Sequence, residues 1–89
     1  MIKVENITNK NGRKIPNQFI IETNKKIYFQ SYNSIIVKKE KGKIYLDVNY
    51  WDYSLTTGKY RNLFLGEDKK TTERKIKEGV YILTNLNGK

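Results

Sequence analysis

The segment Lys43-Ile44-Tyr45-Leu46-Asp47-Val48-Asn49 decides the fold, because it has the most regular alternation of apolar and polar residues in the chain. Successive side chains of a β-strand point to opposite faces of a sheet. One face then carries the apolar Ile44, Leu46 and Val48, and the other carries only polar or amphipathic residues. A strand of this kind is typical of an antiparallel sheet that buries one face.

Residues before this segment predict two further parts of the same sheet. Residues 2–8 and 13–23 form a first hairpin around Asn11-Gly12, because both turn residues tolerate a positive φ. Pro16 cannot donate a hydrogen bond to a neighbouring strand. Its strand therefore lies at a sheet edge or begins after it.

The chain from 26 to 39 is expected to form one long strand. Tyr32-Asn33-Ser34 interrupts it as a bulge or bend, and Lys41-Gly42 reverses it into the strand at 43–49. The sequence thus predicts an antiparallel sheet of about four strands.

The pattern changes from period two to helical after Trp51. Tyr60, Leu63 and Phe64 share one helical face, which predicts a short helix near 57–65, ended by Gly66. Asp68 caps a second helix that reaches about Glu78, and residues 81–83 dock as a short strand or an extended tail. The fold expected for residues 1–89 is a single α+β domain with two short C-terminal helices on one face of the sheet.

Composition excludes several classes of function. The 89 residues include no cysteine and no histidine, so thiolate nucleophiles, histidine bases and the usual zinc and haem sites are absent. The carboxylates, lysines and hydroxyl groups also form no recognisable catalytic combination, and the sequence predicts no cofactor and no metal. No apolar run approaches 18 residues. We therefore expect a non-enzymatic cytoplasmic protein with no membrane partner.

The polar face of the sheet is the first candidate for function. Lysines and tyrosines alternate there, at Lys26, Tyr28, Tyr32, Lys43 and Tyr45. An aromatic ring can stack on a base while an ammonium group meets the phosphate, so the pattern suits nucleic acid. The alternative is that these tyrosines make ordinary cross-strand contacts or lie under the helices.

Net charge points in the same direction. Eighteen lysines and arginines against nine acidic residues leave a charge of +9, which attracts polyanions. Basic residues are dense at 38–43 and 69–77. The alternative is a solvated surface, and the excess of lysine over arginine favours it, because arginine reads phosphates and base edges better.

The aromatic segment 50–65 is the third candidate. Hydroxyl side chains at a helix start, followed by Lys59 and Arg61, are suited to binding one phosphate. The alternative is structural, with Trp51, Tyr60 and Phe64 in the core and the hydroxyl groups of Ser54, Thr56 and Thr57 as caps.

Several of these residues carry a resemblance. Phe29-Gln30-Ser31-Tyr32-Asn33-Ser34, then Trp51-Asp52-Tyr53-Ser54 with Thr56-Thr57-Gly58-Lys59-Tyr60 and Phe64-Leu65-Gly66-Glu67, resemble a family of small uncharacterised proteins from phages and mobile elements of low-GC Gram-positive bacteria. In that family a Tyr-Ser-x-Thr-Thr-x-Lys segment precedes a short Phe-Leu helix. The similarity runs from about Asn17 to Leu86. It implies a phage source and an important segment from Thr56 to Leu65, and it brings no established activity.

A second resemblance lies at the C-terminal end. Residues 79–89 are similar to the opening strand and Thr-Asn-x-Asn-Gly-Lys turn of GIY-YIG nucleases. The second Tyr-Ile-Gly strand, the catalytic arginine helix and the metal-binding glutamate have no residues left to occupy. Nuclease activity is therefore not expected.

Together these patterns predict binding without catalysis. The first hypothesis is a basic phage-encoded protein that contacts DNA or RNA through Lys26, Tyr28, Tyr32, Lys43 and Tyr45, with Lys59 and Arg61 as phosphate partners. The second is an inhibitor of a host machine, such as an anti-defence or anti-CRISPR factor, that binds an acidic surface of a host protein. A free sheet edge would also allow a homodimer.

Overall fold

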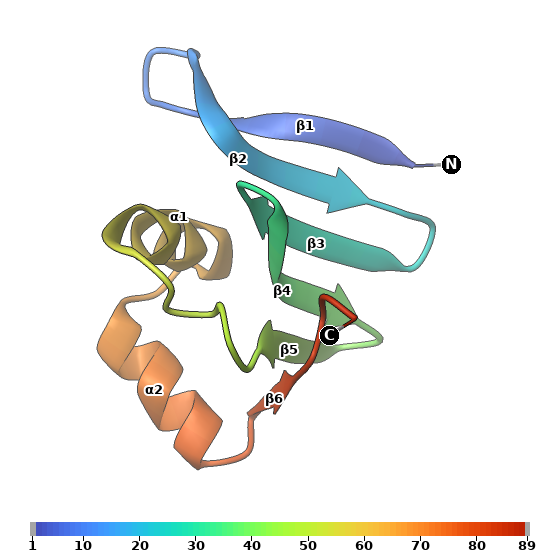
Figure 1. Cartoon of the computed structure of the whole chain (residues 1–89), viewed down its shortest axis with the longest axis vertical. Helices are drawn as coiled ribbons and strands as arrows, with labels where there is room; N and C mark the ends of the chain where they lie inside the picture. Colours follow the sequence, from blue (N-terminus) through green and yellow to red (C-terminus); the bar gives the residue numbers. More distant parts are fainter. Residues whose placement is uncertain (1, 89) are drawn as a thin grey trace.

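Six strands form one sheet in the order in which they occur along the chain (Figure 1). The computed structural model describes residues 2–88. The strands are β1 (Lys3–Thr8), β2 (Lys14–Glu22), β3 (Lys26–Ser31), β4 (Ser34–Glu40), β5 (Lys43–Asp47) and β6 (Tyr81–Thr84). The helices α1 (Leu55–Leu65) and α2 (Lys69–Lys77) lie between β5 and β6 in the chain and on the same side of the sheet.

The α+β class is confirmed, but the sheet is larger than predicted and is mixed. β1 to β5 pair as successive antiparallel hairpins, and β6 pairs parallel to β5. A parallel neighbour needs a long crossover, and the two helices provide it. The prediction of about four strands, all antiparallel, was therefore wrong in number and in the direction of the last strand.

One of the two additional strands comes from the segment 26–39, and the other is β6. Ser31 pairs directly with Ser34, so Tyr32-Asn33 is a two-residue hairpin turn and the expected single strand is two strands, β3 and β4. Neither turn residue is glycine, and the usual sequence signal of a tight hairpin is therefore absent. The predicted Asn11-Gly12 and Lys41-Gly42 turns do form, with φ of 79° at Gly12 and 77° at Gly42.

Pro16 lies inside β2, in a part of the strand that has only one partner. β2 begins at Lys14 and pairs with β1 there, while its pairing with β3 begins at Gln18. The missing amide hydrogen of Pro16 therefore costs no ladder bond toward β3. β1 is the outermost strand, with nothing beside its outer edge in Figure 1.

The core lies between the sheet and the helices. Phe29, Val37 and Leu46 are opposite one another on β3, β4 and β5, and all three are 0% exposed. Phe64 of α1 stacks on Phe29 with 5.7 Å between ring centroids. Burying each such side chain contributes about 1.5–3 kcal/mol, and the contact of Phe29 with Phe64 attaches α1 to the sheet.

Asp47 departs from the alternation that predicted an exposed polar residue. Its side chain is 0% exposed, and it accepts hydrogen bonds from the backbone N–H groups of Asn49, Tyr50 and Leu86. These bonds tie the start of the crossover to the tail that follows β6. Because β5 ends here, Val48 is 49% exposed, although the sequence pattern placed it on the buried face.

The tail after β6 completes β4. The side-chain amide of Asn87 accepts from Ile35 N and donates to Ile35 O, at 2.7 and 3.0 Å. It thus satisfies the backbone of β4 beyond the end of β5. The segment that resembles the opening of a GIY-YIG nuclease is, over the described residues 79–88, a strand and a tail that close the sheet.

Both helices begin and end as the capping residues predict. Ser54 accepts from Thr57 N and caps α1, and Asp68 accepts from Thr71 N and caps α2. Gly66, with φ of 72°, ends α1. The predicted boundaries were correct to within about two residues at each end.

Glu67, between the helices, joins α2 to β6. Its side chain is 8% exposed and accepts hydrogen bonds from Thr72 Oγ1 and Lys75 Nζ at 2.7 Å and from the Tyr81 hydroxyl at 2.8 Å. Burial favours the neutral carboxyl, but the bonds from Lys75, Thr72 and Tyr81 outweigh it and hold the pKa of Glu67 below its usual range.

Replacing Asp47 with alanine should lower the free energy of unfolding by about 3 kcal/mol, because three backbone N–H groups lose a charged acceptor. The measurement is urea denaturation followed by circular dichroism. Asp68→Ala is the matched control: it removes an exposed cap and should cost only about 1 kcal/mol. Equal losses in the two variants would contradict this role for Asp47.

Glu67 should make stability depend on acid. Its pKa is lower in the folded than in the unfolded protein, so its contribution is complete above about pH 4.3 and is lost as the pH falls through the folded pKa. Glu67→Gln should therefore be less stable at neutral pH, and the gap from wild type should narrow toward about pH 3. Urea unfolding at several pH values measures this gap. A gap that stays constant would contradict the prediction.

Candidate nucleic-acid interface

The face of the sheet opposite the helices carries an aromatic and basic row. Tyr28 of β3, Lys38 of β4 and Tyr45 of β5 are directly opposite one another in the register. Each neighbours, along its own strand, a member of the buried row of Phe29, Val37 and Leu46, so it points to the other face. The Lys38 ammonium lies 4.6 Å from the centroid of the Tyr45 ring. We call Tyr28, Lys38 and Tyr45 the platform row.

A second row lies beside the platform row at the end of the sheet where β3 begins. It consists of Lys26, Glu40 and Lys43, again in register. Glu40 contacts Lys38 Nζ at 3.3 Å and Lys26 Nζ at 3.8 Å. This face thus carries three lysines and one carboxylate, which contacts two of them, so the face is cationic. Lys25 and Lys41 lie in the two turns at the same end and line a shared groove of about 330 Å³.

The structure therefore brings together four of the seven residues predicted for the site: Lys26, Tyr28, Lys43 and Tyr45. None of them is fully buried, so the tyrosines are not sealed under the helices. Lys38, at the centre of the platform row, is an addition. In the sequence, only its place in the basic run 38–43 indicated a functional role for Lys38. Its position opposite Tyr28 could not be predicted, because residues 26–39 were expected to form one strand and not a hairpin.

Tyr32 lies apart from the platform. Tyr32 is in the β3–β4 turn, where 47% of the residue is exposed to solvent and its backbone has a positive φ of 55°. Its N–H donates to Asn17 O, and its carbonyl accepts from Gln30 Nε2, both at 2.7 Å. The turn that the sequence did not predict therefore removes Tyr32 from the surface to which it was assigned.

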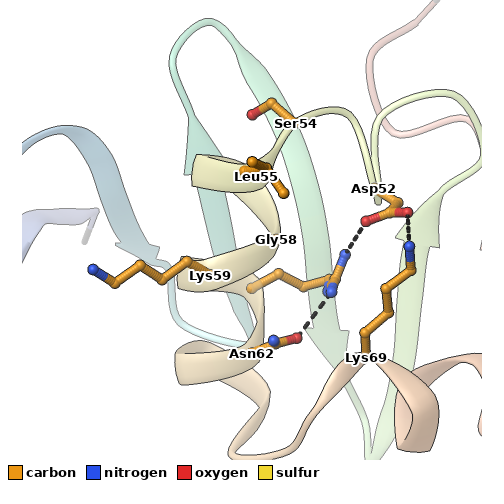
Figure 2. A pocket seen from close by; sticks show the side chains of 8 residues that line it. Asp52, Ser54, Leu55, Gly58, Lys59, Asn62 and Lys69 are labelled. Carbon is orange, nitrogen blue, oxygen red and sulfur yellow. Dashed lines mark hydrogen bonds and ion pairs between the residues drawn. The ribbon is translucent and has the colours of Figure 1, made fainter.

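Lys59 and Arg61 are on α1, on the other side of the sheet. Arg61 is 1% exposed, and its guanidinium donates to Trp51 O, Asp52 Oδ1 and Asn62 Oδ1 at 2.8, 3.0 and 2.9 Å. The prediction that Arg61 meets a phosphate together with the platform is at odds with this burial, because its hydrogen-bonding groups are directed inward. Lys59 is exposed, and Figure 2 shows its side chain pointing away from Asp52.

Asp52 links the crossover to both helices. It contacts Arg61 NH1 at 3.0 Å and Lys69 Nζ at 2.6 Å, within a pocket of about 570 Å³ (Figure 2). Burial works to raise the pKa of Asp52, but the hydrogen bonds from Lys69 and Arg61 prevail and keep the pKa low. One carboxylate with two cations leaves the cluster with a net charge of +1, and the two ion pairs join the crossover to α1 and α2.

The structural alternative for segment 50–65 is confirmed for its aromatic residues and for Ser54, whereas the Thr56 and Thr57 hydroxyl groups cap no backbone N–H group in the described part of the chain. Trp51, Tyr60 and Phe64 pack against the core, and Ser54 caps α1. Thr57 is 1% exposed and shares a 2.9 Å hydrogen bond with Ser31. Within residues 2–88, no three histidine, cysteine, aspartate or glutamate side chains are grouped as a metal ion requires. No helix in that range has the length and apolar character to cross a bilayer.

Comparison with known proteins identifies the family. A model of a family of unknown function, DUF8033, matches residues 2–79. The chain belongs to this family. This agrees with the predicted membership of an uncharacterised family. Neither the curated proteins nor the solved structures contain a match.

Arg61 should be essential to stability. Arg61→Lys keeps the charge but cannot reach three acceptors in different directions, so we expect a loss of about 3 kcal/mol in the free energy of unfolding. Lys59→Ala, an exposed change on the same helix, should stay within about 0.5 kcal/mol of wild type. Thermal or urea unfolding measures both. An Arg61→Lys variant as stable as wild type would contradict the buried role.

Proposed function

We propose that this protein binds single-stranded nucleic acid, DNA or RNA, without catalysis, and that the open face of the sheet is its binding surface. The observation that supports this most directly is the in-register row of Tyr28, Lys38 and Tyr45, with Lys26 and Lys43 beside it. The face has no helix over it, and its lysines outnumber its carboxylates three to one.

Bases would stack on the rings of Tyr28 and Tyr45, which are separated by two strand spacings, or about 10 Å. Stacking on an aromatic side chain is worth about 1–3 kcal/mol per base and needs unpaired bases. Lys26, Lys38 and Lys43 would meet the phosphates on either side. The remaining positive charge of the chain would draw the strand toward this face from a distance.

The phage source, the cytoplasmic location and the lack of enzymatic activity belong to the same proposal. The resemblance to phage and mobile-element proteins supports the first two. The absence of histidine and cysteine from the sequence supports the third, because it removes the commonest bases and nucleophiles.

One observation favours the alternative, a protein-binding inhibitor of a host machine such as an anti-defence factor. The platform row continues into Ile21 and Val4 on one side and Ile82 on the other. Val4 is 58% and Ile82 38% exposed. Exposed apolar side chains beside a basic row suit an acidic protein surface that also offers apolar side chains, since protein interfaces combine apolar and polar contacts.

Fluorescence anisotropy with a labelled 12-nucleotide DNA or RNA strand tests the first function. Wild type should bind at low salt, and log Kd should rise with log salt concentration. Tyr28→Ala and Tyr45→Ala should each weaken binding about tenfold with an unchanged salt slope, and Lys43→Ala should make the slope shallower. Lys70→Ala, on α2, is the matched control and should change both the affinity and the salt slope less than Lys43→Ala does.

A wild-type protein that does not bind any strand at about 50 mM salt would contradict the proposed function. A partner recovered from host lysate after nuclease treatment, and lost with Val4→Asp, would then support the inhibitor.

A further inference from the structure

A second concave surface lies at the far end of β3 from the basic row. It is a cleft of about 600 Å³ between the β3–β4 turn and the segment that leads into α1. Three tyrosines line it, Tyr32, Tyr50 and Tyr53, and the rings of Tyr50 and Tyr53 meet edge to face at 5.6 Å. Tyr53 is 67% exposed, so its ring has a free face.

The residues that line this cleft are all uncharged. Besides the tyrosines it consists of five serine and threonine side chains, one asparagine and one isoleucine. Charged residues make up 30% of the sequence, and none of the ten lining residues belongs to them. The cleft is therefore suited to a neutral, flat group with hydrogen-bonding edges and not to a phosphate.

The backbone of Tyr32 provides an independent reason to assign this cleft a ligand. A positive φ is readily adopted by glycine and asparagine but is unusual for a bulky side chain. Such strain persists where the surroundings impose it, and it concentrates at functional sites. The two-residue β3–β4 turn imposes the positive φ here, at a position where glycine or asparagine is usual. An aromatic ring is thereby placed at the mouth of the cleft.

We propose that this cleft binds one nucleobase of the strand that the platform holds, stacked against Tyr32 or Tyr53. The inference rests on the proposed function and extends it from a stacking surface to a base pocket. The cleft opens on the helical side of the sheet, because Ser31, which lines it, bonds to Thr57 of α1. Tyr32 lies in the turn between this side and the platform face, four residues or about 13 Å of chain after Tyr28, which is the span of two to three nucleotides. A nucleic-acid strand that follows β3 along the platform would therefore reach the cleft by bending around the β3–β4 turn.

The hydroxyl groups of the cleft differ in what they can offer a base. Ser31, Ser54 and Thr57 already bond to one another, at 2.9 and 3.1 Å. Ser34 and Thr56 line the same cleft and supply further donors and acceptors for a base edge. Hydrogen bonds of this neutral kind add little salt dependence, in contrast to the lysine contacts of the platform.

Two cleft variants test the proposal with the same labelled 12-nucleotide strand. Tyr53→Ala and Tyr32→Gly should each weaken binding about tenfold and leave the salt slope unchanged. Tyr32→Gly should not lower the melting temperature, because glycine relieves the positive φ that tyrosine tolerates poorly. Leu63→Ala, which truncates another exposed apolar side chain outside the cleft, is the control and should bind as wild type does.

A third measurement does not depend on the platform. Adenosine or thymidine added at millimolar concentration should shift backbone amide resonances at 31–34 and 53–57 in a nitrogen–proton correlation spectrum, and should shift them less in Tyr53→Ala.

The outcomes separate the two proposals. If wild type binds the strand and both cleft variants bind equally well, the cleft is not a base pocket, while the platform stands. If Tyr32→Gly melts several degrees below wild type, Tyr32 is a packing residue and its positive φ does not indicate a ligand site. If wild type binds no strand, the proposed function fails and the base pocket fails with it.

Discussion

The burial of Phe29, Val37 and Leu46 in one register row is the constraint on which the rest of the structure depends. Side chains alternate along a strand, so the register that places these three residues on the helical side of the sheet also places their neighbours on the opposite face. A slip of one residue between β3 and β4 would expose the core and bury Lys38. The hydrophobic effect on one face thereby arranges the charged and aromatic groups of the other.

The second constraint is polar and lies at the ends of the strands. Asp47 bonds to the backbone at the start of the helical crossover and to the tail after β6, and Asn87 in that tail satisfies the backbone of β4 beyond the end of β5. Arg61 and Asp52 join α1 to the segment that precedes it. These buried polar groups are costly unless each is partnered, which makes the arrangement specific. Because Arg61 is bound in this way, its guanidinium is not available to a ligand.

The candidate site could be predicted only where strand alternation decides it. Tyr28 and Tyr45 share a face because each belongs to a regular strand whose neighbours are apolar. Tyr32 was misplaced because a two-residue turn without glycine leaves little trace in a sequence. Arg61 was misplaced because its partners, Trp51 and Asp52, are brought to it by the crossover, and an arginine in a polar helical segment gives no sign of burial. Lys38 came to the centre of the platform only through its register with β3 and β5.

The residues alone therefore determined the class of the fold, most turns, the caps of both helices and the alternation of the central strands, because these depend on contacts within a few residues of each other. The number of strands, the parallel pairing of β6, the burial of Asp47 and Arg61, and the aromatic cleft were decided by the tertiary structure. Each of them depends on groups that are distant along the chain and that meet only when the helical crossover folds back onto the sheet. The free energy of these contacts comes from satisfying buried polar groups and from packing across elements, and neither leaves a periodic signal in the sequence.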